Sequence, residues 1–554
     1  MAQGLDAPGR NSKLEIRNSP RFSIFDFRVR GFQSRTFLPW AASALSGLLL
    51  VACFPKIHLR GLVWVACLPL LMALAGEKRL KRAFLLGYVC GVFFFAGSCY
   101  WFLTVLELYG HLAPALAVGV LILFVIIDST FFGGFGLAMG WAARRSPGWA
   151  LALSPFLWVA MELARTYLIT GFPWNLLGYA VQAPGVRQIA SVTGVYGLSF
   201  LAVATSALLA WVVLSTRRAR AGLALAGWLV LLLLAQWRMA PPPEVMGQEL
   251  AFLLQPNVPL DEAAADAWAP WRDPSQLQQL VQLSVATVDQ VLSTARPALP
   301  QGAVAHPPLL IWAENPAPFF FTRDPVFRNA MENMARQTHS MVIGNTIIPV
   351  DAKGDTITNS AFTLDPEGRE VSRYDKIHLV PFGEYVPGWA LPGLVNKITS
   401  EVGNFVPGSS YSVAKSPGGG IGVFICYEAI IPQLARKLVA GGAGVLVNIS
   451  NDAWYGDSAA AYQHLEMARL RAVENHRYLL RATNNGLTTL IDPYGRVLEE
   501  IPRYQRRVML AHFNFETRQT FYSAHGDVFA WLCAAVAGLM LTLGSISKKL
   551  GARS

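Results

Sequence analysis

Long apolar stretches with few charges crowd into the first 240 residues. Seven lie in this part of the chain, and an eighth lies near the C-terminus. About 20 mostly apolar residues are needed to cross the hydrocarbon core of a bilayer, so the pattern predicts eight membrane-spanning helices. The eight stretches are 37–55, 61–76, 83–106, 112–142, 147–170, 192–215, 221–238 and 526–546.

The pattern changes abruptly after three consecutive prolines, Pro241 to Pro243. Short apolar runs rich in branched residues then alternate with helical stretches, which is typical of a water-soluble α/β domain. The predicted strands are 250–254, 309–312, 341–348, 360–364, 420–426, 444–449 and 487–491. The predicted helices are 276–295, 325–338, 430–441 and 459–480.

Composition supports a membrane protein. Of the 554 residues, 53% are hydrophobic and only 15% are charged, with a net charge of +11. A soluble domain usually carries about 25% charged residues, so soluble and disordered classes are both excluded. A basic excess can indicate nucleic-acid binding, but here it follows the predicted loops, so we expect no nucleic-acid partner.

The basic residues predict the topology. They cluster before the first apolar stretch, in alternate loops and in the C-terminal tail. The positive-inside rule therefore places these segments in the cytoplasm and the α/β domain on the opposite side. The richer loops carry Lys78, Arg79, Lys81 and Arg82, then Arg144 and Arg145, then Arg217, Arg218 and Arg220.

Four parts follow from this topology. Residues 1–36 form a basic cytoplasmic tail, and 37–240 form a transmembrane domain of seven helices whose first helix is an uncleaved anchor. Residues 241–524 form the extracytoplasmic domain, and 525–554 form the eighth helix and a second basic cytoplasmic tail.

Cys426 stands apart from the other five cysteines, all of which fall in predicted spans. It follows a predicted strand, and strand ends in α/β domains are where reactive groups gather. A thiol outside the cytoplasm without a disulfide partner is a candidate nucleophile, although an isolated cysteine is more often inert and buried. No cysteine spacing suits zinc, and we expect no metal site.

Two more residues could assist such a thiol. Glu314 follows a predicted strand and could act as a general base, although a lone carboxylate there is more often a solvated loop residue. Lys376 could stabilise an oxyanion, although a lone lysine is usually a surface residue.

The order Glu314, Lys376, Cys426 resembles the catalytic triad of the nitrilase, or carbon–nitrogen hydrolase, superfamily. Together with eight spans, the chain from about residue 37 to 545 is similar to the bacterial apolipoprotein N-acyltransferase family. The most specific segments are 374–387 (YDKIHLVPFGEYVP), 426–428 (CYE), 448–456 (NISNDAWYG), 469–486 (RLRAVENHRYLLRATNNG) and 171–175 (GFPWN). Gln255 and Asn257 match the family's first-strand QxN.

This resemblance implies a fold and a reaction. The soluble domain would be an αββα sandwich on the periplasmic side of the bacterial inner membrane. Glu314 would take the proton of Cys426, and the thiolate would attack the sn-1 ester of a phospholipid while Lys376 binds the oxyanion. The S-acyl enzyme would then acylate the α-amine of the N-terminal S-diacylglyceryl cysteine of an apolipoprotein. This ping-pong reaction needs no cofactor, and we expect a monomer.

The resemblance also implies supporting and substrate-binding residues: Glu384, Tyr427, Glu428, Asn451 and Trp454. The alternative for Glu384 is a purely structural ion pair. The alternative for Trp454 is packing on the core.

The chain departs from the family's usual pattern near two of the motifs. Ala313 and Asn315 flank the presumed base where the family usually has Trp-Pro-Glu, and Asn475 and His476 stand where Thr-Gly is usual. Residues 319–321, three consecutive phenylalanines, could either dip into lipid or belong to the core.

Two other functions use the same features. A membrane-tethered amidase would pass the acyl group to water. A transporter or scaffold would carry an inactive nitrilase-like domain, but the spans hold few ionisable residues of the kind that a transport pathway needs.

Overall fold

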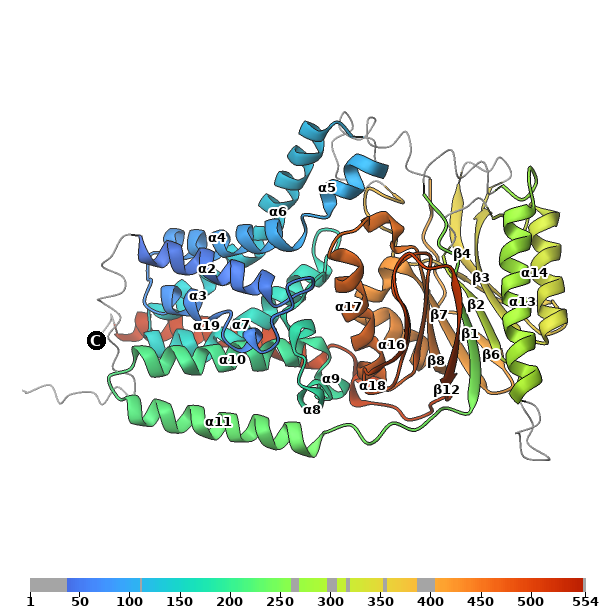
Figure 1. Cartoon of the computed structure of the whole chain (residues 1–554). Coiled ribbons are helices and arrows are strands. Elements are labelled where there is room, and N and C mark those ends of the chain that lie inside the picture. Colours follow the sequence, from blue (N-terminus) through green and yellow to red (C-terminus); the bar gives the residue numbers. More distant parts are fainter. Residues whose placement is uncertain are drawn as a thin grey trace, which may run out of the picture.

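The computed structural model describes residues 37–109, 112–260, 269–295, 306–314, 319–351, 356–385 and 404–551. The basic tail at 1–36 lies outside the described residues. A helical bundle and an α/β sandwich lie end to end, with the C-terminal helix returning through the bundle (Figure 1).

Each of the eight predicted apolar stretches contains a helix in the bundle. Among the described residues, five helices have the length and composition needed to cross a bilayer: α4 (Leu80–Ser98), α6 (Pro114–Ala143), α7 (Pro147–Tyr167), α10 (Val195–Leu214) and α11 (Arg218–Arg238). The other three stretches give shorter apolar helices. These are α2 (Leu38–Ala52), α3 (Leu68–Leu74, after a 3-10 turn at Leu62–Trp64) and α19 (Val528–Gly551), which is apolar over Val528–Leu543.

Small residues explain the close contact between α4 and α6. A Cβ atom on Gly87 would lie 2.2 Å from the Phe132 carbonyl oxygen, and one on Gly136 would lie 2.2 Å from the Ala83 carbonyl oxygen. The two backbones therefore touch at positions where a larger residue would not fit, which is a common way for membrane helices to associate.

Helix α11 lies along the outside of the bundle (Figure 1). Ala221 is its only buried residue, while Leu223 and Trp237 are about three-quarters exposed. An apolar helix that presents almost its whole surface outward is suited to contact with lipid chains.

The α/β part contains two six-stranded sheets. The first has the order β12-β1-β2-β3-β4-β5 and the second β11-β10-β9-β8-β7-β6. The first sheet contains β1 (Glu249–Gln255), β2 (Leu309–Trp312), β3 (Met341–Pro349), β4 (Ile357–Leu364), β5 (Glu370–Asp375) and β12 (Arg507–Phe513). The second contains β6 (Val413–Ser416), β7 (Gly419–Ile425), β8 (Ala443–Ser450), β9 (Leu479–Thr483), β10 (Thr488–Ile491) and β11 (Val497–Ile501).

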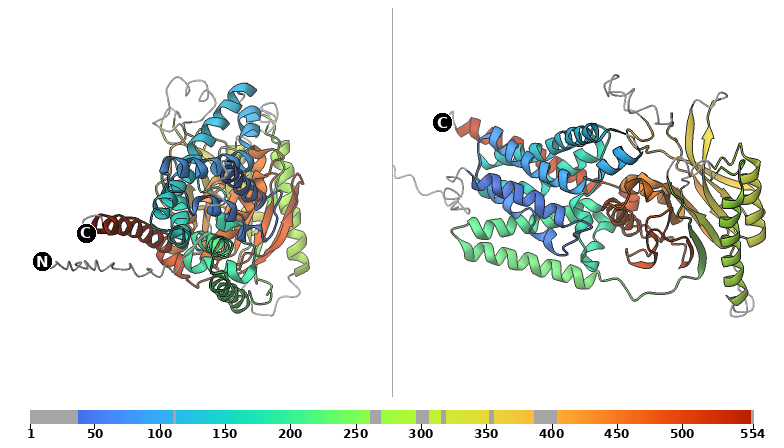
Figure 2. Two further views of the ribbon diagram at one scale, coloured as in Figure 1. Left: turned by 90° about the vertical axis from the view of Figure 1, so that its left-hand side faces the viewer. Right: turned by 45° about the horizontal axis from the view of Figure 1, so that its top comes forward.

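Alternation along the strands builds the layers. In β1, Ala251 and Leu253 point into the core between the sheets, whereas Phe252 and Leu254 pack under α13 (Ser275–Ala295) and α14 (Pro325–Thr338). On the other side, α16 (Pro432–Ala440) and α17 (Ala460–Asn475) cover the second sheet and face the bundle (Figure 2). The order helix, sheet, sheet, helix confirms the expected αββα sandwich.

Short helices complete the chain where the two parts meet. They are α5 (Phe102–Thr104) with a π turn at Val105–Tyr109, α8 (Pro184–Arg187), α9 (Ala190–Thr193) and α18 (Phe521–His525), together with a 3-10 turn at Leu177–Ala180.

The predicted helix 459–480 is wrong at its end. Helix α17 stops at Asn475 because His476 adopts a left-handed conformation, and β9 then pairs in parallel with β8. Strands β5, β6, β9, β11 and β12 had no prediction. Four of these, β5, β6, β11 and β12, are the edge strands of the two sheets, and in β5, β6 and β11 few apolar residues mark a strand.

Candidate active site

Cys426 lies at the turn where β7 ends and a 3-10 helix, Cys426–Ile430, begins. Its φ of +50° is left-handed, a conformation that costs free energy for any residue other than glycine. The side chain is 6% exposed at the carboxyl edge of the second sheet. Such a sharp turn holds a nucleophile in a fixed place at the edge of a sheet.

Glu428 anchors this turn and joins it to the first sheet. Its Oε2 accepts a hydrogen bond from the Ile425 N–H at 2.8 Å. Its Oε1 accepts bonds from the Tyr374 hydroxyl at 2.8 Å and from the N–H groups of Ile377 and His378 at 2.7 and 3.0 Å. Burial raises the pKa of Glu428 to about 7, although these donors favour its charged form.

Glu314 and Lys376 meet at the matching edge of the first sheet. Glu314 follows β2, and Lys376 follows β5, which runs parallel to β3, so both strands end at the same edge. The Lys376 Nζ lies 3.7 Å from Glu314 Oε1, and both side chains are buried. The structure therefore brings the predicted base and the predicted cation together.

Glu384 is the closer partner of the lysine. Its Oε1 lies 2.7 Å from Lys376 Nζ, and its Oε2 accepts a bond from the Val380 N–H at 2.8 Å. Burial alone would lower the pKa of Lys376, but Glu384, Glu314 and the Cys426 thiol raise it above its ordinary value. Lys376 is thus a permanent cation beside the thiol.

Two residues hold the Glu314 carboxylate. The Asn451 backbone N–H donates to Oε2 at 2.9 Å, and the Asn359 Nδ2 donates to Oε1 at 2.9 Å. Asn451 was among the predicted residues, and it contacts Glu314 through its backbone N–H. Asn359 was missed, because it stands between Thr358 and Ser360 in a polar part of β4 where the sequence gives no signal for it.

The Cys426 thiol is kept protonated. Burial raises its pKa above the ordinary value and the Glu314 carboxylate raises it further, whereas Lys376 and the Ser450 hydroxyl lower it. A thiol in this state needs a base to become a nucleophile, and Glu314 is the carboxylate with the largest effect on it.

A buried charged network lies beneath the nucleophile, and sequence reasoning missed it. Arg481 Nη2 lies 2.8 Å from Asp452 Oδ2, and the side chains of Arg481, Asp452 and His464 are fully buried. Burial alone would raise the Asp452 pKa, but Arg481 and His464 hold it well below its ordinary value. Burial and Arg481 lower the His464 pKa. Its Nε2 donates to the Cys426 carbonyl at 3.1 Å.

The bundle reaches this network directly. Trp174, from the 171–175 motif, stacks on the His464 ring at 5.8 Å and donates from Nε1 to Gln463 Oε1 at 2.7 Å. The Tyr427 hydroxyl donates to the Gly171 carbonyl at 3.4 Å. Tyr427, which follows the nucleophile, and His464, which binds the nucleophile's carbonyl, therefore both contact the 171–175 loop of the helical bundle.

The sequence also singled out Trp454 and the three phenylalanines at 319–321. Trp454 is 42% exposed on a 3-10 turn, Asp452–Tyr455. Phe319 and Phe321 are buried in the core under α14, which settles that alternative in favour of the core for these two.

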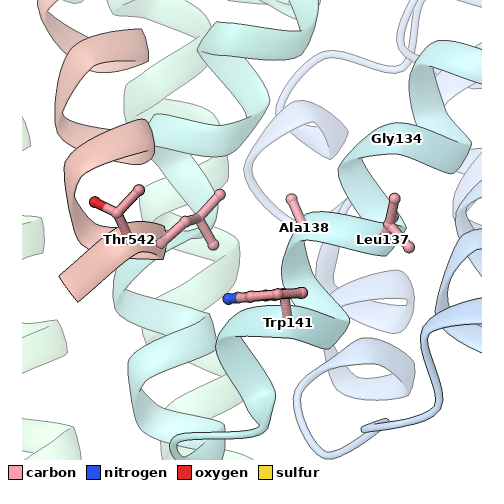
Figure 3. A pocket seen from close by; sticks show the side chains of 6 residues that line it. Gly134, Leu137, Ala138, Trp141 and Thr542 are labelled. Carbon is pink, nitrogen blue, oxygen red and sulfur yellow. The ribbon is translucent and has the colours of Figure 1, made fainter. Parts of the chain in front are cut away.

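A groove between α6 and α19 lies apart from these groups (Figure 3). It has a volume of about 290 Å³ and is lined by Gly134, Leu137, Ala138, Trp141, Leu541 and Thr542. None of these side chains is a nucleophile or a base. Across the described residues, no group of three or more His, Cys, Asp or Glu side chains could hold a metal ion.

Two family models match the chain. Residues 274–522 match "Carbon-nitrogen hydrolase", and residues 46–208 match "Apolipoprotein N-acyltransferase N-terminal domain". Together these matches cover most of the sandwich and most of the helical bundle.

Similar full-length proteins bear one name. The apolipoprotein N-acyltransferase of Geobacter metallireducens is 36% identical over 94% of this chain and 98% of its own length. That of Allorhizobium ampelinum is 33% identical over 85% of this chain and 87% of its own length.

Among solved structures, an amidase from Nesterenkonia sp. AN1 aligns over 52% of this chain and 98% of its own, with 17% identity and a TM-score of 0.35. Nit3 from Saccharomyces cerevisiae aligns over 50% of this chain and 93% of its own, with 16% identity and a TM-score of 0.34.

Proposed function

The chain belongs to the apolipoprotein N-acyltransferase family, and from this premise we propose how its residues carry out the reaction. It is a membrane-bound acyltransferase that N-acylates apolipoproteins with an acyl chain from a membrane lipid. The mechanism is supported by two observations: Glu314 and Lys376 lie 3.7 Å apart at one edge of the first sheet, and the Cys426 thiol is close enough for both charges to shift its pKa.

In the first half-reaction, Glu314 accepts the proton of the Cys426 thiol. The thiolate attacks the sn-1 ester carbonyl of a phospholipid, and the tetrahedral oxyanion is stabilised by the Lys376 ammonium. The ester C–O bond then breaks, and the lysophospholipid oxygen takes the proton from Glu314. The enzyme keeps the acyl chain as a thioester.

In the second half-reaction, the α-amine of an S-diacylglyceryl cysteine attacks the thioester. Glu314 accepts a proton from the amine, the C–S bond breaks, and the Cys426 thiolate recovers that proton. Glu384 holds Lys376, Glu428 holds the nucleophile turn, and Asn451 holds the base. Tyr427 ties the turn to the bundle, and Trp454 contributes to the rim of the substrate pocket.

The topology supports a leaflet-facing reaction. We propose that the eight apolar helices all span the bacterial inner membrane, with residues 241–524 in the periplasm and both termini in the cytoplasm. This arrangement follows the distribution of basic residues, and it puts the site at the surface where both lipid substrates are embedded.

The amidase alternative is not favoured, because the similar full-length proteins are named acyltransferases and share the bundle as well as the sandwich. An amidase would release free fatty acid or ammonia and would have no requirement for a lipid-facing bundle.

The test is the intact mass of the detergent-purified protein after incubation with a defined phospholipid. We expect a mass gain of one acyl chain that neutral hydroxylamine removes. Cys426→Ala should show no gain, whereas Cys533→Ala, which removes a buried thiol of α19, should behave as the parent protein does.

Addition of a diacylglyceryl-cysteine peptide should then discharge the enzyme and acylate the peptide. Free fatty acid without acylated peptide would instead support the hydrolase, and a mass gain that persists in Cys426→Ala would overturn the assignment of the nucleophile.

A further inference from the structure

Asn359 occupies the point where the two carboxylates of the site approach each other. Its Nδ2 lies 2.9 Å from Glu314 Oε1 and 3.1 Å from Glu384 Oε1. Its Oδ1 accepts a hydrogen bond from Asn345 Nδ2 at 2.8 Å. Ionised carboxylates can only accept, so the amide nitrogen must face them, and the Asn345 donor on the opposite side fixes that orientation. The Asn359 side chain is 5% exposed.

Lys376 is shared unequally between the same carboxylates. Its Nζ is 2.7 Å from Glu384 and 3.7 Å from Glu314. Glu314 is instead held by two neutral donors, the Asn359 amide and the Asn451 N–H. A carboxylate in close contact with an ammonium binds a proton less readily than one held by neutral donors. Lys376 is therefore the close partner of Glu384 and only a more distant neighbour of Glu314.

We propose that Asn359 is a positioning residue that directs the lysine to Glu384 and keeps Glu314 available as the proton acceptor. The inference rests on the function proposed above. Without the Asn359 amide, Glu314 Oε1 would lose its neutral donor and would turn to the nearest remaining one, the Lys376 ammonium. The base and the oxyanion-binding group would then neutralise each other.

Two substitutions make opposite predictions. Asn359→Leu removes both donors, so Glu314 pairs with Lys376 and becomes a weaker base. Asn359→Asp keeps the shape but adds a third negative charge, which makes protonation of Glu314 more favourable. In single-turnover formation of the thioester, the acid limb of the pH–rate profile should move to lower pH in Asn359→Leu and to higher pH in Asn359→Asp.

The rate at neutral pH should fall in both variants by about 10- to 100-fold, the loss expected for hydrogen bonds to a charged group. Asn475→Leu is the matched control, because Asn475 is also buried but donates to the Arg471 carbonyl. It should leave the position of the acid limb unchanged.

The outcomes separate the two proposals. If the parent protein forms no thioester, the proposed function fails. If it does form one and the acid limbs of both Asn359 variants coincide with that of the parent, the inference is wrong. If thermal unfolding shows that Asn359→Leu does not fold, the isosteric Asn359→Asp is the deciding variant. An acid limb at the same pH as in the parent protein would then overturn the proposal.

Discussion

The two sheets of the sandwich supply different halves of the site. The first sheet contributes Glu314, Asn359 and Lys376, which are linked at its edge by the Asn359–Glu314 hydrogen bond and the Lys376–Glu314 ion pair. The second contributes Cys426, whose backbone is fixed on both sides: Glu428 binds the preceding N–H and His464 binds the Cys426 carbonyl.

This difference suits a reaction in two half-steps. The proton acceptor must serve first a thiol and then an amine, and side chains joined by hydrogen bonds can adjust between them. The nucleophile must return to the same place after each transfer, and backbone anchoring achieves this. The comparison predicts that damage to the first sheet changes proton transfer, whereas damage to the second changes stability and geometry.

The largest effect is expected from Glu314→Gln. Loss of the general base should slow thioester formation by about 10²- to 10⁴-fold. Because the Cys426 pKa lies above its ordinary value, the thiolate is scarce at neutral pH. The residual rate should therefore rise about tenfold per pH unit on the alkaline side, as the thiolate fraction does.

Intact mass at several pH values provides this measurement. Glu367→Gln, which alters an exposed carboxylate paired with Arg369, is the matched control and should keep the parent profile. An unchanged rate in Glu314→Gln would mean that the first sheet does not supply the base.

Asp452→Asn should act on stability instead. Removing the charge leaves Arg481 buried without its partner, which costs about 3–5 kcal/mol in the free energy of unfolding. Asp457→Asn is the control, because its ion pair with Lys56 is exposed and is worth about 0–1 kcal/mol. Denaturant unfolding in detergent measures both, and equal losses would contradict the prediction.

The pH dependence of this contribution has a definite sign. The folded-state pKa of Asp452 lies below its unfolded value, so the stabilisation is complete above the ordinary aspartate range. It is lost only as the pH falls below that range toward the folded pKa.

Glu428→Gln tests the connection between the sheets. The carboxylate accepts four hydrogen bonds, and an amide nitrogen would face one of the same donors. We expect the activation free energy of acylation to rise by about 1.5–3 kcal/mol, which slows acylation roughly 10- to 100-fold. The variant should still fold. Glu499→Gln, at an exposed position, should have no effect. An acylation rate equal to that of the parent protein in Glu428→Gln would show that the loop after Lys376 keeps its position without this carboxylate.

The smallest effect is expected from Tyr427→Phe. The hydrogen bond to the Gly171 carbonyl is long, at 3.4 Å, and its loss should cost about 0.5 kcal/mol, or roughly twofold in rate. Steady-state kinetics with phospholipid should place this change in KM. Tyr411→Phe, which alters a contact with Lys437, is the control. A large loss of kcat would mean that the hydroxyl takes part in the chemistry.

Periodicity predicted the layers of the sandwich because its central strands are apolar on both faces. It failed at β9, where the apolar pattern of α17 continues past His476 although the backbone turns there. The left-handed residue that ends the helix is a histidine, not the glycine that would have indicated the end.

The triad of Glu314, Lys376 and Cys426 was predicted from its order along the chain and from the motifs around Lys376 and Cys426, which resemble those of the nitrilase superfamily. Asn359 and His464 could not be predicted, since their importance depends on which strand or loop lies opposite. The unequal sharing of Lys376 between two carboxylates is likewise a property of distances that the sequence does not contain.

The sandwich begins after α11 and ends at α19, so both of its ends are anchored in the bundle. In the proposed topology the site is therefore confined to the membrane surface, where its substrates diffuse in two dimensions. The rate of encounter then depends on the number of substrate molecules per unit area of bilayer, and dilution of the surrounding water leaves it unchanged. For this enzyme, the mole fraction of lipid or lipoprotein in the leaflet is the concentration that matters.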